Sequence, residues 1–400
     1  MRRPLASLLV AESVSLVGSH VSGIAVPWLV LTTTGSATRV GAVALAQTLP
    51  FVLAGMLGGP LVDRIGPRRV AIASDAASAA VVGLVPVLHL LGLLSFGPLV
   101  AIVAVAGVFA GATNTAKRAL LPQAAGRTPM ARATALFDGV GRAAILIGLP
   151  LGGVLVAAVG PAAVLAIDAA SFAFCATLVA AGVHTRATAP ARSESYLAQL
   201  GDGFAFLRRD TLFAVIVGVL FFTNLADQAY STVFVPVWVK ETGAGPATLG
   251  LLGGVFGLGA VLGSVVYAAL ATRLPRVLTF AVCFLIAGSP RFFALAATDR
   301  LLPVLAVAFG AGLAVAAVNP VLMALGYERI PPHLRGRVLG VATAIGFAGL
   351  PLGGLLGGVA VDHAGARVAL LLAGGLYLAV TLVPFALIKR RIDDRSLVTG

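Results

Sequence analysis

The chain has 400 residues, of which 59% are hydrophobic and only 11% are charged, and its formal net charge is +13. Soluble domains carry about a quarter charged residues and disordered chains are poor in hydrophobic ones, so the composition excludes both classes. A bilayer-spanning helix needs roughly 20 mostly apolar residues. We therefore expect an all-α membrane protein with many spans, since an open sheet edge cannot be satisfied in hydrocarbon.

Apolar segments separated by Gly, Pro or charged residues recur along the whole chain. The first follows Arg2 and Arg3 and continues to Thr32, which is too long for the apolar region of a secretory signal, so we expect it to stay attached as a span. In chain order the segments predict twelve spans, over 5–32, 40–62, 70–91, 97–120, 132–157, 161–183, 211–238, 247–271, 277–297, 301–325, 337–360 and 366–388.

Lys and Arg are distributed unevenly between the two sets of predicted loops. Only four of the 28, namely Arg39, Lys240, Arg300 and Arg367, fall in the outer loops, whereas Lys117 and most others fall on the side of the termini. This is the positive-inside bias, and it predicts cytoplasmic N- and C-termini in a bacterial inner membrane. It also explains the basic charge without a nucleic-acid partner.

The longest polar stretch divides the spans six and six. We expect an N-terminal bundle over 1–183, a central cytoplasmic loop over 184–210, and a C-terminal bundle with a short tail over 211–400. Within the loop, apolar residues at helical spacing predict a short amphipathic helix at the membrane interface, with a disordered linker as the alternative. These residues are Tyr196, Leu200, Phe204 and Leu207.

The two halves also resemble each other in sequence. The letters of Gly148 to Gly153 recur as Gly349 to Gly354, and Val26-Pro27-Trp28 is echoed within 235–238. A repeated six-helix unit in parallel orientation is typical of transporters, with a ligand site between the repeats near mid-membrane.

The residues after the second span form a recognisable motif. They read Gly59-Pro60-Leu61-Val62-Asp63-Arg64-Ile65-Gly66-Pro67-Arg68-Arg69. This resembles the signature of the major facilitator superfamily, from which it departs at Pro67. The resemblance implies two pseudo-symmetric six-helix bundles and a cytoplasmic gate formed by Gly59, Asp63, Arg64, Gly66, Arg68 and Arg69, which we expect Asp75 to join. Gly59 would allow close helix packing and Gly66 a tight turn. The alternative is that the basic residues only set the topology.

Three shorter stretches resemble the efflux branch of that superfamily, which contains enterobactin-type siderophore exporters and macrolide efflux pumps. They are 33–37, 119–122 and 335–338. The run from Gly148 to Gly153 is similar to the antiporter motif of drug exporters, although Ile145, Leu149 and Val154 stand where that motif has glycines.

Polar residues inside the spans are costly in hydrocarbon and therefore mark candidate sites. One face of the seventh span carries Asn224, Asp227, Gln228 and Ser231, and one face of the first carries Glu12, Ser15, Ser19 and His20. We expect these faces to line a substrate cavity with Asn114 and Asn319, and Asp227 and Glu12 to be the proton-coupling candidates. The alternative for Asp227 is a structural pair across helices. Asp168 and Arg291 lack an evident partner in the sequence.

The predicted function is secondary transport by alternating access, as a proton-coupled exporter of a small amphipathic or hydrophobic molecule. The alternative is an uncoupled facilitator or importer with the same fold. An enzyme is not expected, because the five His residues are scattered, and no P-loop motif for ATP is present. We expect no metal ion or cofactor, and a monomer whose partners are the substrate, protons and the bilayer.

Overall fold

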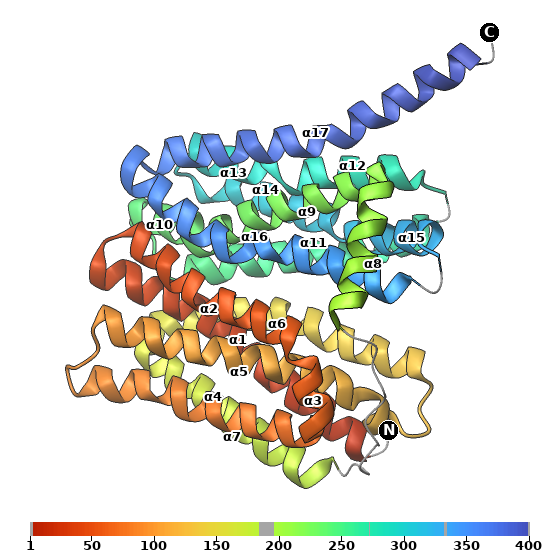
Figure 1. Cartoon of the computed structure of the whole chain (residues 1–400). Helices are drawn as coiled ribbons and strands as arrows, with labels where there is room; N and C mark the ends of the chain where they lie inside the picture. Colours follow the sequence, from red (N-terminus) through yellow and green to blue (C-terminus); the bar gives the residue numbers. More distant parts are fainter. Residues whose placement is uncertain (1–2, 184–195, 272, 332–333, 399–400) are drawn as a thin grey trace. The chain divides into compact units, whose positions relative to one another are not determined.

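The computed structural model describes residues 3–183, 196–271, 273–331 and 334–398, and Figure 1 traces them. In this part of the chain, twelve helices are long and apolar enough to cross a membrane, which confirms the predicted number of spans. Eight spans are continuous helices: α1 Arg3–Thr34, α2 Ala37–Leu57, α4 Pro67–Leu90, α5 Phe96–Ala125, α6 Met130–Val159, α7 Pro161–Gly182, α11 Ala247–Leu270 and α16 Arg335–Ala364. A ninth begins the helix α17, Ala366–Val398.

Three predicted spans are interrupted, and a proline follows each interruption. The seventh span consists of α9 Thr211–Ala229, a π-helical turn η1 Tyr230–Phe234, and α10 Val235–Glu241. The ninth consists of α12 Arg276–Ala287 and α13 Ser289–Ala297, and the tenth of α14 Leu301–Val315 and α15 Val318–Arg329. A proline lacks an N–H and its ring clashes with the carbonyl four residues earlier. The residue four positions before each of Pro236, Pro290 and Pro320 lies in or next to the interruption.

The segment predicted as a span over 40–62 is shorter than expected. The helix α2 ends at Leu57, and a separate short helix α3, Gly59–Ile65, follows with Pro60 in its first turn. Gly66 then turns the chain into α4 with a φ of 96°, a conformation that favours glycine, so the predicted tight turn is confirmed. Among the described residues of its own unit, no atom lies within 4 Å of the position of a Cβ at Gly59, so the expected close packing at Gly59 is not found within that unit.

The first compact unit comprises residues 1–191, 231–254 and 354–359. Within it α1 packs against α6 and α7, α2 packs against α5, and α4 packs against α5 and α7. Glycines of α6 allow its close approach to α1, since a Cβ at Gly148 would meet His20 and one at Gly152 would meet the backbone of Val21.

The second compact unit comprises residues 192–230, 255–353 and 360–400. Within it α17 packs against α9, α12 and α13, and α12 also packs against α14 and α15. Gly349 and Gly353 of α16 leave no room for a Cβ beside the backbone of Phe221 and Leu225 in α9. The glycines of the repeated sequence thus have the same role in both units: they allow α6 to pack closely on α1, and α16 to pack closely on α9. The division into bundles at 184–210 stays a prediction.

The central loop contains the predicted helix, α8, Tyr196–Arg209. Leu207 is buried with Phe213, Ile330 and Val338, and Gly203 lies against Val341. The predicted helix is confirmed for these residues, against the alternative of a disordered linker, and its position at the membrane interface stays a prediction.

Candidate functional site

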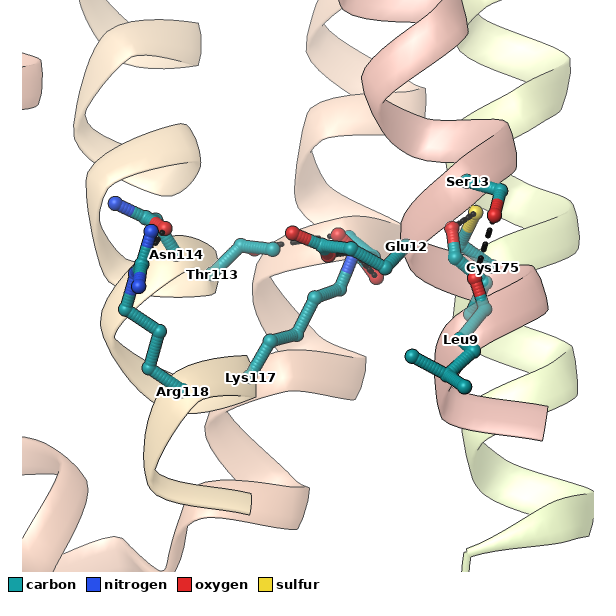
Figure 2. A network of polar contacts seen from close by, with 10 residues as sticks. Leu9, Glu12, Ser13, Thr113, Asn114, Lys117, Arg118 and Cys175 are labelled. Carbon is teal, nitrogen blue, oxygen red and sulfur yellow. Dashed lines mark hydrogen bonds and ion pairs between the residues drawn. The ribbon is translucent and has the colours of Figure 1, made fainter. Parts of the chain in front are cut away.

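Three charged side chains from three helices of the first unit meet in its interior. Lys117 Nζ of α5 lies 3.5 Å from Glu12 Oε2 of α1 and 3.3 Å from Asp75 Oδ2 of α4. At most 7% of any of these side chains is exposed. Thr113, one turn before Lys117, donates a hydrogen bond of 3.2 Å to Asp75 Oδ1. We call Glu12, Asp75 and Lys117 the carboxylate–lysine cluster; Figure 2 shows Lys117 reaching toward Glu12.

Helix geometry explains why these residues lie at one level. Glu12 is nine residues after Arg3, and Asp75 is eight after Pro67, so at 1.5 Å per residue they lie about 14 and 12 Å inside their helices. Lys117 lies eight residues before the end of α5, again about 12 Å. All three helix ends are on the side predicted to be cytoplasmic.

Buried apolar side chains lie between the cluster and the ends of α1 and α5. Leu8 and Leu9 of α1 and Leu120 and Leu121 of α5 belong to one buried core that also contains Cys175 of α7. The Cys175 thiol donates to the carbonyl of Ala11, 3.0 Å away.

The cluster contains two carboxylates and one ammonium group. When all three are ionised, one negative charge remains uncompensated in a buried site, which is strongly unfavourable. Arg118, the next cation along α5, is exposed and directed elsewhere, toward Asn114 Oδ1 at 3.3 Å and the ring of Phe137. A single proton shared by the two carboxylates would make the cluster neutral, and that proton belongs to the group as a whole.

Lys117 was counted among the basic residues of the cytoplasmic side, and its burial between two acids was not expected. The helix α5 continues to Ala125, beyond the predicted end of the span at residue 120, and Lys117 lies well inside it with 1% of its side chain exposed. The sequence carried one signal for this position, the i, i+4 spacing of Thr113 and Lys117 on one helix face.

A second ion pair lies in the second unit. Arg291 Nη2 of α13 lies 2.6 Å from Asp227 Oδ1 of α9, and its guanidinium lies 4.8 Å from the ring centre of Tyr230 and 5.6 Å from that of Phe256. Such cation–π contacts add to the stability of a desolvated guanidinium. With both groups ionised the pair has no net charge, so it needs no additional proton. The Asp227 side chain is 40% exposed, and that of Arg291 is 10% exposed.

The break before α13 positions Arg291. Gly288 separates α12 from α13, and the ring of Tyr377 from α17 occupies the place where a side chain at residue 288 would lie. Arg291 therefore has a partner that the sequence did not reveal. The geometry agrees with the structural alternative for Asp227, and its role in proton coupling stays a prediction.

The other expected cavity residues lie in different environments. In α1, Ser15 is buried, His20 is half-buried and Ser19 is exposed. Asn224 Nδ2 donates to the carbonyl of Gly346, 3.1 Å away, which satisfies part of the α16 backbone. Gln228 is half-buried, Ser231 and Asn319 are exposed, and Asn114 accepts from Arg118. Their role in binding a substrate stays a prediction.

The residues of the 59–69 motif lie mostly at the surface. Asp63, Arg64 and Arg69 are exposed, whereas Arg68 Nη2 donates to the carbonyl of Ala180, 2.6 Å away, and so ties α4 to α7. Asp75 was expected to join this motif and instead pairs with Lys117 in the interior. The gating role of the motif stays a prediction.

Comparison with known proteins gives a consistent result over the whole chain. The sequence profile of the transmembrane secretion effector family matches residues 2–398. The multidrug efflux pump Tap of Mycolicibacterium fortuitum is 32% identical over 379 residues, which cover 91% of this chain and 90% of that protein. Tap of Mycobacterium bovis is 29% identical over 405 residues, covering 98% and 94%.

Solved structures resemble the chain in fold. A mutant of the nucleoside transporter NupG has a TM-score of 0.82 at 13% identity, covering 96% of this chain and 99% of that one. The D-xylose–proton symporter has a TM-score of 0.71 at 14% identity, covering 95% and 96%. These similarities confirm the predicted fold class.

Proposed function

Because this chain belongs to the transmembrane secretion effector family of the major facilitator superfamily, we propose that it is a proton-coupled exporter, an antiporter, of small amphipathic or hydrophobic molecules. It is a multi-pass membrane transporter and not an enzyme. Its cargo is a drug, siderophore or secondary metabolite, and the similarity to the multidrug efflux pump Tap favours drugs among these.

The observation that carries the coupling is the charge balance of the carboxylate–lysine cluster. Two buried carboxylates share one lysine, so the site is neutral with one proton and carries a net negative charge without it. A cluster that can take up and release one proton while its charged side chains stay together is suited to carry the proton. We assign this role to Glu12 together with Asp75, and Asp227 is the second candidate.

The surroundings of the cluster supply a reason for proton exchange to be linked to movement. Leu8, Leu9, Leu120 and Leu121 separate it from the cytoplasmic ends of α1 and α5. Release of the proton to the cytoplasm therefore requires a local opening of these ends. In this proposal the opening accompanies the movement of one bundle against the other in alternating access.

The energy available from one proton is sufficient for useful export. One charge crossing about 100 mV supplies about 2.3 kcal/mol. Since 1.4 kcal/mol corresponds to a tenfold ratio, this supports a cargo gradient of roughly fifty-fold.

The cellular setting follows from the same proposal. The transporter works as a monomer in a bacterial cytoplasmic membrane with both termini in the cytoplasm, as the distribution of Lys and Arg favours. The competing candidate is an uncoupled facilitator or importer, which would need no proton carrier.

The test compares two modes of transport in proteoliposomes, with ethidium as a fluorescent cargo. We expect a pH gradient to drive ethidium uphill in the wild type, and Glu12→Gln to abolish this while preserving the exchange of ethidium between equal concentrations. Val10→Ala, at an exposed position on the opposite face of α1 from Glu12, is the control and should keep both modes. Uphill transport that persists in Glu12→Gln would remove Glu12 as a carrier, and a wild type insensitive to the pH gradient would favour the facilitator.

A further inference from the structure

The two acids of the carboxylate–lysine cluster lie at nearly the same distance from the ammonium group that they share. Lys117 Nζ is 3.3 Å from Asp75 Oδ2 and 3.5 Å from Glu12 Oε2. A cation in this position favours the ionised form of either acid to a similar extent. Lys117 therefore does not decide which of the two acids carries the proton that neutralises the cluster.

A threonine hydroxyl group distinguishes the two acids. Thr113 Oγ1 donates to Asp75 Oδ1 at 3.2 Å, so one oxygen of Asp75 has the hydroxyl group as its partner and the other has the ammonium group. Among the residues that the structure describes, Lys117 is the only polar partner of the Glu12 carboxylate. A hydrogen bond donated to the charged form of an acid favours that form. The geometry thus favours an ionised Asp75 and leaves the proton to Glu12.

The hydroxyl group of Thr113 is directed away from its own helix. A threonine inside a helix commonly donates to the carbonyl four residues earlier, and Thr115 of α5 does so to Gly111. Thr113 is buried and donates to Asp75 of α4 instead. Thr113 and Lys117 are one turn apart and extend from α5 in the same direction (Figure 2). The helix α5 therefore supplies both groups that hold Asp75.

The two acids also differ in burial. None of the Asp75 side chain is exposed, whereas 7% of the Glu12 side chain is exposed. A carboxyl group exchanges its proton through contact with water, so Glu12 is the better placed of the two to take up and release one.

The other charged or titratable groups on the helices packed against α1 do not compete for this proton. Arg118 of α5 is exposed, as are Asp138 and Arg142 of α6. From α7, the Cys175 thiol donates its hydrogen to a backbone carbonyl of α1. The acids in direct contact with the buried ammonium group are thus Glu12 and Asp75 among the described residues.

We propose that the proton of the cluster resides on Glu12, that Asp75 stays ionised beside Lys117, and that Thr113 is the positioning residue responsible for this distribution. The inference rests on the proposed function, since it specifies which acid carries the coupling proton. When Glu12 releases its proton to water, Asp75 and Lys117 remain a neutral pair, so the contact between α4 and α5 is kept throughout the cycle.

The test is infrared spectroscopy of the full-length protein in vesicles at neutral pH without a pH gradient. A protonated carboxyl group has a C=O band that an ionised one lacks. A heavy carbon isotope in the carboxyl groups of all glutamates, or of all aspartates, lowers the frequency of this band for that residue type alone. Any other protonated acid contributes equally to the wild type and to a variant, and cancels in the difference spectrum.

Asp75→Asn gives the decisive difference spectrum. The variant keeps one acid and one lysine, which are neutral when both are ionised, so the cluster no longer needs a proton. We expect the band lost in Asp75→Asn to be shifted by labelled glutamate and not by labelled aspartate, although the substituted residue is an aspartate. Glu12→Gln should remove the same band, which keeps the test valid if one of the two variants does not fold.

Thr113→Val tests the positioning role, because it removes the hydroxyl group and keeps the branched shape. We expect the ratio of glutamate-bound to aspartate-bound proton to fall about tenfold or more, as for the loss of one hydrogen bond to a charged group. The glutamate band should weaken and an aspartate band should appear. Thr113→Ser keeps the hydroxyl group and should keep the wild-type ratio.

The possible failures can be told apart. A lost band that shifts with labelled aspartate would overturn the assignment to Glu12, and an unchanged ratio in Thr113→Val would overturn the role of Thr113. If neither Asp75→Asn nor Glu12→Gln removes a band, the cluster holds no proton, and the inference fails together with the carrier role of Glu12. A glutamate band in a wild type whose ethidium transport ignores the pH gradient would support the inference and remove the proposed coupling alone.

Discussion

The ammonium group of Lys117 lies 3.5 Å from the carboxylate of Glu12, although the two residues are more than a hundred positions apart in the sequence. Asp75 lies on the other side of the same ammonium group, 3.3 Å away. One lysine thus compensates two acids, and the charge state of each depends on the others. This arrangement makes the cluster sensitive to the removal of any single member.

Removal of Lys117 should be the most damaging change in the cluster. Lys117→Gln leaves two buried carboxylates without a cation, and breaking a buried pair in this way costs about 3–5 kcal/mol. We expect a clearly lower melting temperature for this variant in detergent. The double variant Lys117→Gln with Asp75→Asn removes one acid as well and should recover part of the loss. A double variant less stable than Lys117→Gln would contradict the shared-charge account.

The Asp227–Arg291 pair can be tested by a double-mutant cycle. Asp227→Asn leaves the buried guanidinium of Arg291 without its acid and should lose up to about 3–5 kcal/mol of stability, whereas Arg291→Gln leaves an acid whose side chain is 40% exposed and should lose less. The double variant is neutral and should be more stable than either single one, as measured by thermal unfolding.

The same double variant decides whether Asp227 also carries protons. If Asp227 only neutralises Arg291, the folded double variant should retain pH-driven transport of ethidium. Loss of uphill transport, with exchange preserved, would instead support Asp227 as a coupling residue.

Gly288 is expected to tolerate no side chain. The ring of Tyr377 lies where the Cβ of Gly288→Ala would be placed, and overpacking of this kind costs about 1–3 kcal/mol. Because the break at this glycine positions Arg291, we also expect slower transport. Gly310→Ala is the control, since no atom lies within 4 Å of its Cβ position. Equal melting temperatures for the two variants would show that the contact with Tyr377 is unimportant.

The gating role of the 59–69 motif predicts an effect of Asp63 on access. Asp63 is exposed beside the turn at Gly66, where a gate contact could form and break. Asp63→Ala should change the rate at which a cysteine placed at the exposed Ile65 reacts with a membrane-impermeant maleimide, by several-fold, while Arg39→Ala should not. An unaltered rate in Asp63→Ala would leave the motif with a topological role only.

The sequence by itself determined the number of spans, their approximate limits and the internal repeat. These features depend on hydropathy along the chain and on local spacing, which are properties of neighbouring residues. It also identified Glu12 and Asp227 as acids in the spans that need a partner or a purpose. It did not determine where prolines interrupt a helix, since Pro50 and Pro150 lie within continuous helices whereas Pro290 follows a break.

Only the tertiary structure decided which charges meet. Asp227 and Arg291 are 64 residues apart, and Ser22 and Asp168 are 146 apart. Spacing along one helix tells which residues share a face, and it contains no information on which helix packs against that face. For the same reason the sequence did not show that Lys117 lies buried between Glu12 and Asp75, or that Asp168 is held by Ser22 and Ser171.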